Sequence, residues 1–146
     1  MRDLSSNIKT ASSINAVAAG TTGTGQVGAV VDRKGYDGVT FINNFGAITA
    51  TDATFTLVIK EGDATGTMTS VADADLIGTE LGASIIAGTP RADGGNENVA
   101  TRIGYIGGKR YVSANIVNTV TAATPVASTV ILSHPNQAPV AQSDIS

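Results

Sequence analysis

The sequence predicts an all-β protein, an antiparallel β-sandwich or barrel of about seven to nine short strands. Short apolar runs that alternate with polar residues recur along most of the chain, and Gly, Asp and Asn close them. No long segment has the apolar spacing of a helix. The 146 residues, 42% of them hydrophobic, suffice for one domain with its own core.

The chain is expected to divide into an extended N-terminal arm over 1–25, a β-sandwich over 26–134 and a C-terminal tail over 135–146. Serines throughout the arm and glycines at its end favour loose or turn conformations. Pro135 and Pro139 end the last strand, because proline has no N–H to donate to a ladder.

Residues 53–60 give the clearest strand signal. Apolar residues occupy every second position from Ala53 to Ile59, so one face is expected to be buried and the threonine-rich face to be at least partly wet. The same alternation, with turn residues between the runs, predicts further strands over 28–31, 39–43, 67–71, 84–87, 99–106, 110–120 and 126–132. One helical turn is expected over 73–77, with Asp73 as its cap.

Residues for metal and thiol chemistry are scarce. The chain has no Cys and one His, which excludes disulfides, thiolate catalysis, cysteine-built zinc sites and histidine pairs. Asp73 with Asp75, and Glu61 with Asp63, supply too few oxygens for calcium, which takes about 6–8. We interpret these carboxylates as turn and capping residues, and expect no cofactor and no metal.

Two patterns have an enzymatic interpretation that the surrounding residues do not favour. The glycines of 23–28 are spaced as in a dinucleotide-binding turn, but no strand precedes them and no helix follows, which indicates a flexible turn. His134 is compatible with a Ser/His/Asp arrangement, yet no serine lies in a nucleophile motif. We interpret His134 as a hydrogen-bonded residue at a strand end, and do not expect an enzyme.

The charge balance argues against nucleic acid and membrane as partners. Nine Lys and Arg against twelve Asp and Glu give a formal net charge of −3, which leaves no basic field for phosphates. No apolar segment approaches the roughly 20 residues that span a bilayer, and residues 1–19 lack the apolar run of a secretory signal. We therefore expect a soluble protein made in a cytosol.

One local basic cluster stands out, formed by Arg102, Lys109, Arg110 and Tyr111. Four residues without a wider basic field bind phosphates weakly at physiological salt. Arg and Tyr are enriched at protein interfaces, so the cluster predicts a contact with a neighbouring subunit.

Several segments resemble a family of small virion proteins of tailed bacteriophages: 1–9, 35–42, 71–78, 102–112 and 132–135. The resemblance runs nearly end to end and is to head decoration or minor capsid proteins. It implies a β-rich fold, synthesis in the cytoplasm of the host bacterium, attachment to the outside of the major capsid shell, and assembly as a homotrimer.

The residues favour the same class by a separate route, because polar ends that order on a partner surface add weak contacts together. We therefore expect a structural virion protein that stabilises the capsid by bridging major capsid subunits. Its contacts are predicted in the arm and the tail, at Leu4, Ile8, Ile14, Val140 and Ile145.

Two alternatives stay open. A surface-exposed module for carbohydrate or host-cell adhesion would use exposed loops such as 88–98, although no Trp and three Tyr are a weak signal for stacking on sugars. Another virion component, such as a neck or tail protein, would share the same Gly-, Thr- and Ala-rich β style.

Overall fold

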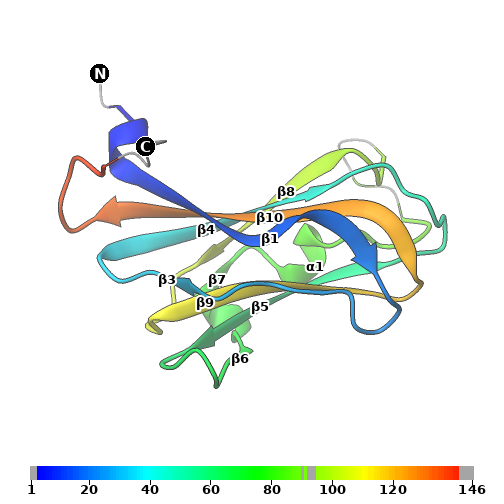
Figure 1. Cartoon of the computed structure of the whole chain (residues 1–146), viewed down its shortest axis with the longest axis horizontal. Helices are drawn as coiled ribbons and strands as arrows, with labels where there is room; N and C mark the ends of the chain where they lie inside the picture. The colour runs from blue at the N-terminus through cyan, green and yellow to red at the C-terminus, as the bar shows by residue number, and fades with distance from the viewer. Residues whose placement is uncertain (1–2, 90, 92–94, 142–146) are drawn as a thin grey trace.

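The computed structural model describes residues 3–89, 91 and 95–141, which fold into two antiparallel sheets packed face to face (Figure 1). In sheet A the strand order is β1 (Ile8–Gly20), β10 (Ala122–Pro135), β4 (Tyr36–Phe45), β8 (Val99–Tyr105) and β7 (Leu76–Ile77). In sheet B it is β2 (Gln26–Val27), β9 (Tyr111–Asn118), β5 (Phe55–Gly62) and β6 (Thr69–Ser70), and β3 (Val31–Asp32) also pairs with β9. The predicted all-β sandwich is confirmed, with ten strands in the described residues.

The core lies between the sheets and follows from the alternation along the strands. Phe55, Leu57 and Ile59 of β5 are fully buried, as the pattern over 53–60 predicted. The Phe55 ring meets the Phe45 ring of β4, with centroids 6.2 Å apart and planes tilted by 42°. Each such side chain contributes about 1.5–3 kcal/mol when it leaves water.

The prediction of a loose arm over 1–25 is wrong for most of its length, because Ile8–Gly20 form β1 and pair antiparallel with β10. The register shifts between Ser12 and Ile14, and again between Ile14 and Val17. Such bulges break the period of two that marks a strand in sequence. The Ser13 hydroxyl then joins the sheets: it donates to the Ala29 carbonyl oxygen at 3.1 Å and accepts from the Ala114 N–H at 3.0 Å.

The middle of the chain also differs from prediction. The turn expected over 73–77 is a 3-10 helix, η2 (Asp73–Asp75), followed by β7, and Ala72 rather than Asp73 occupies its N-cap. The strand expected over 84–87 is reduced to a single bridge between Ile85 and Phe55, and a short helix, α1 (Glu80–Ala83), precedes it. The Thr79 hydroxyl caps α1 by accepting from the Gly82 N–H at 2.9 Å.

The α1 segment and Ser84 cover the part of the β5 edge that β6 leaves unpaired. The Leu57 N–H donates to the Ser84 hydroxyl at 2.8 Å, and the Ile59 N–H donates to the Glu80 carboxylate at 2.6 Å. Side chains thus take the place of a neighbouring strand, which explains why the sequence there does not alternate.

Both described ends of the chain meet at one end of the sandwich, which we call the terminal end (Figure 1, left). The Val140 N–H donates to the Ser6 carbonyl oxygen at 2.7 Å, and the Asn136 N–H donates to that of Gly35 at 2.9 Å. The residues that follow Pro135, up to Val140, therefore pack against the body of the same chain.

Candidate functional site

The terminal end gathers most of the residues predicted to make contacts. Leu4, Ile8 and Val140 lie around the chain ends. Lys109 and Arg110 lie in the loop between β8 and β9, and Tyr111 begins β9 (Figure 1). Ile14 does not belong to this set: it is buried in the core at 4% exposure, because the bulge turns it inward, so its prediction as a contact residue is wrong. Arg102 lies on β8, and Ile145 is outside the described residues.

Leu4 is held outward by a short 3-10 helix, η1 (Ser5–Asn7). The Asp3 carboxylate precedes this turn and accepts the Ser5 N–H at 2.9 Å and the Ser6 N–H at 3.2 Å. The Ser6 hydroxyl also donates to Asp3, and these bonds lower the pKa of the Asp3 carboxyl. As a result Leu4 stands 71% exposed on an ordered turn.

Beside Leu4 lies a hollow of about 330 Å³. Its wall includes Ile8 and Pro135, which are apolar, and His134, which is exposed. A second hollow, of about 380 Å³, shares Pro135 with the first. Tyr36 lines it on one side, and residues of the C-terminal segment between Pro135 and Ala141 line the rest. The terminal end therefore offers an exposed leucine at one of two shallow depressions that share Pro135.

Two basic residues of the terminal end, Arg110 and Lys109, are paired with carboxylates. Both oxygens of Asp32 accept from the Arg110 guanidinium, at 3.0 and 2.7 Å, and this contact lowers the pKa of Asp32 to about 2. Lys109 lies 2.5 Å from the Asp63 carboxylate, which raises the pKa of the Lys109 ammonium. These two cations, predicted as a basic cluster, therefore carry no excess positive charge.

Sequence reasoning missed a second part of this arrangement, formed by Arg33 and Tyr105. Arg33 donates to the carbonyl oxygens of Lys109 at 2.6 Å and Gly107 at 2.8 Å, and its guanidinium carbon lies 5.4 Å from the centre of the Tyr105 ring. The Tyr105 hydroxyl donates to the Glu61 carboxylate and accepts from the Lys109 N–H. Burial and the hydrogen bond to Glu61 raise the pKa of Tyr105.

The motifs with an enzymatic interpretation have structural roles in the described residues. Gly25 and Gly28 pass so close to β9 that a Cβ atom would lie 1.9 Å from the Ile116 oxygen and 2.0 Å from the Ala114 oxygen. His134 is exposed, and its Nδ1 lies 3.1 Å from the neighbouring Ser133 hydroxyl. Within residues 3–89, 91 and 95–141, no three acidic or histidine side chains gather as a metal site.

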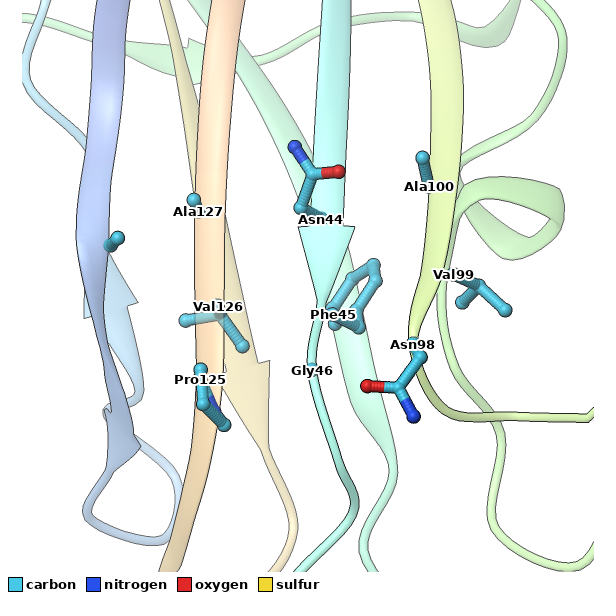
Figure 2. Close-up of a pocket in the computed structure, with 10 residues that line it drawn as sticks. Asn44, Phe45, Gly46, Asn98, Val99, Ala100, Pro125, Val126 and Ala127 are labelled. Atoms are coloured by element: carbon cyan, nitrogen blue, oxygen red, sulfur yellow. The ribbon is translucent and has the colours of Figure 1, made fainter.

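A third hollow, of about 360 Å³, lies on sheet A toward the opposite end (Figure 2). Small outward residues of neighbouring strands, Ala100 and Ala127, leave the space open, and Asn44 and Asn98 place amide groups beside it (Figure 2). Amides donate and accept hydrogen bonds but do not exchange protons at neutral pH, so this hollow has binding chemistry rather than catalytic chemistry.

Comparison with known proteins adds no family. No protein-family model matches the chain, and no curated protein matches it significantly. Among the helices that the structure describes, none has the length and apolar character needed to cross a bilayer.

Proposed function

We propose that this chain is a structural protein of a tailed-bacteriophage virion that binds the outside of the capsid and stabilises it by bridging major capsid subunits. The proposal combines the resemblance of the five sequence segments with the form of the terminal end. In this proposal copies of the chain also associate with one another, as the homotrimer that the resemblance implies.

The observation that carries the proposal is the position of Leu4. A leucine that is 71% exposed is costly in water and forms a suitable anchor when a partner covers it. Its turn is ordered by Asp3, and the bond between Val140 and Ser6 holds the C-terminal segment against the same turn. A pre-ordered anchor loses little entropy when it binds, which favours attachment to a rigid shell.

The paired charges of Lys109 and Arg110 at the terminal end support a protein partner. Lys109 and Arg110 face Asp63 and Asp32 of their own chain, so contact there depends on shape and apolar area more than on charge. Binding to capsid shells is therefore expected to change little between about 50 and 200 mM salt, unlike binding to nucleic acid.

The test is co-sedimentation of the purified chain with empty shells of the major capsid protein from the same phage. Leu4→Asp is expected to lower the affinity at least about tenfold, because it places a charge in the apolar contact. Leu81→Asp is the matched control: Leu81 is also 71% exposed but lies on α1, away from the terminal end (Figure 1). Failure of the unmodified chain to bind, or equal binding of the two variants, would contradict the proposal.

A further inference from the structure

We propose that copies of this chain contact one another through a strip on the outer face of sheet A at its β7 edge, so that Arg102 of one copy meets Asp75 of the next. The strip consists of Asp75, Ile106, Ile77 and Arg102, and we call it the β7 strip. The inference rests on the self-association included in the proposed function, and it assigns a surface to it.

The pairing between β7 and β8 determines which apolar side chains of the strip face outward. Leu76 pairs with Tyr105 and both are buried, so their neighbours Ile77 and Gly104 face outward. An ideal Cβ on Gly104 would lie 3.1 Å from the Cβ of Ile77, which shows that Ile77 lies across Gly104. Ile77 is 62% exposed and Ile106 is 58% exposed, so two large apolar side chains lie uncovered at this edge.

Opposite charges lie on the two sides of these isoleucines. The Ile106 N–H donates to the Asp75 carbonyl oxygen at 2.9 Å, which extends the pairing by one position and places Asp75 beside Ile106. Arg102 precedes Gly104 by two residues on β8, so its side chain shares the outward face at the other side of Ile77. In order, the strip presents an acid, two isoleucines and a cation.

Neither charge of the strip has a partner within the described part of its own chain. No ion pair or side-chain hydrogen bond involves Arg102 or the Asp75 carboxylate among the described residues, whereas Lys109 and Arg110 at the terminal end both have one. A second copy supplies both missing partners. When a two-fold axis passes through Ile77, the isoleucines of the two copies meet and each Arg102 faces the other copy's Asp75.

Charge complementarity distinguishes a second copy from a different protein as the occupant. The strip holds both members of the ion pair that it needs, in an order that a second copy matches when turned around. A two-fold pair makes the Arg102–Asp75 contact twice, and a three-membered ring makes it once at each interface. The number of copies is therefore a result of the experiment, and the contact is the proposal.

The experiment measures the mass of the purified full chain against concentration, by sedimentation velocity without capsid shells. Arg102→Glu and Asp75→Lys are each expected to raise the dissociation constant at least about tenfold, since like charges then face each other. Lys9→Glu, on the opposite edge strand of sheet A, makes the same change of net charge as Arg102→Glu and should leave the mass unchanged. Leu4→Asp should also leave it unchanged, which separates this test from that of capsid attachment.

Mixing the two charge variants completes the test. In a mixed pair the carboxylate introduced by Arg102→Glu faces the ammonium introduced by Asp75→Lys, so an equimolar mixture is expected to recover the mass of the unmodified protein. In a ring of three, every mixed assembly keeps at least one contact between like charges, so the mixture is expected to recover the mass of the unmodified protein only in part. A chain that carries both substitutions restores an opposite-charge contact at each interface and is expected to recover that mass fully. A monomeric unmodified chain, or variants that associate like it, would overturn the proposal.

Discussion

Two polar networks connect the strands of this sandwich, one inside it and one at its terminal end. In the inner network the Ser128 hydroxyl donates to the Asn43 amide oxygen at 2.7 Å, and Thr101 donates to a backbone carbonyl of α1 at 2.8 Å. All three residues are buried. In the outer network the Asp32–Arg110 pair is the best-aligned contact, and both side chains remain more than 40% exposed.

The comparison teaches that burial, more than charge, decides what each contact contributes. A buried polar group that loses its partner costs about 1–3 kcal/mol, because water cannot replace the lost hydrogen bond. An exposed ion pair contributes about 0–1 kcal/mol, because water and salt solvate its charges when it breaks. The neutral inner network should therefore be far more sensitive to substitution than the charged outer one.

The largest effect is expected for Asn43→Asp. The new carboxylate would accept from Ser128, but it would have no cation beside it, and the Thr101 hydroxyl already donates elsewhere. We expect the free energy of unfolding at pH 7 to fall by about 3–5 kcal/mol, measured by urea denaturation. Burial raises the pKa of such a carboxyl in the folded chain above the value of about 4 that it has in the unfolded chain, so the deficit should shrink as the pH falls from the raised pKa toward about 4.

A control for this substitution lies next to it in the chain. Asn44 is exposed on the outer face of β4, so Asn44→Asp makes the same chemical change without burying the charge. It should change the free energy of unfolding by less than about 0.5 kcal/mol. Equal losses in the two variants would contradict the assigned difference between the networks.

Parts of the inner network could be predicted from sequence. Asn43 follows Val39 and Phe41 at a spacing of two, which indicates the same inward face. Its partners could not be predicted, because Ser128 lies on β10 and Thr101 on β8. Strand order and register bring them opposite Asn43, and neither follows from a local pattern.

The terminal end was predicted in pieces rather than as a site. Exposed apolar and basic residues indicated Leu4 and Lys109, but the bulges of β1 hid a strand and turned Ile14 into the core. Arg33 carried no signal, because an arginine in a turn has no spacing that indicates which carbonyl oxygens it will bind. The sequence gives a weak signal for Tyr105. Its inward position follows from the alternation over 99–106, but its hydrogen bond to Glu61 does not.

An intermediate effect is expected for Tyr105→Phe, since Tyr105 joins the interior to the outer network. Its loss leaves Glu61 and the Lys109 N–H without their common partner, and should lower the free energy of unfolding by about 1–2 kcal/mol at pH 7. Tyr111→Phe is the control, because no hydrogen bond of the Tyr111 hydroxyl occurs in the described part of the chain.

The raised pKa of Tyr105 adds a pH dependence to this prediction. Above about pH 10 the unfolded chain ionises this tyrosine while the folded chain keeps it protonated, so the unmodified protein should lose stability as the pH rises further. Tyr105→Phe removes that part of the slope, which urea denaturation between pH 9 and pH 11 would measure. If the substitution left the pH dependence of the free energy of unfolding unchanged, the Tyr105 hydroxyl would be solvated in the folded chain, and the prediction would be wrong.

The smallest effect is expected for Asp32→Asn, although it breaks the best-aligned ion pair. The Arg110 guanidinium holds the pKa of Asp32 at about 2, below its usual value, so the pair stabilises the fold above about pH 4 and loses its effect as the pH falls toward 2. Because both side chains are largely solvated, the difference from the unmodified protein should not exceed about 1 kcal/mol at pH 7. It should diminish in 1 M salt and vanish on acidification. A loss larger than that of Tyr105→Phe would mean that charge, rather than burial, ranks the contacts of this protein.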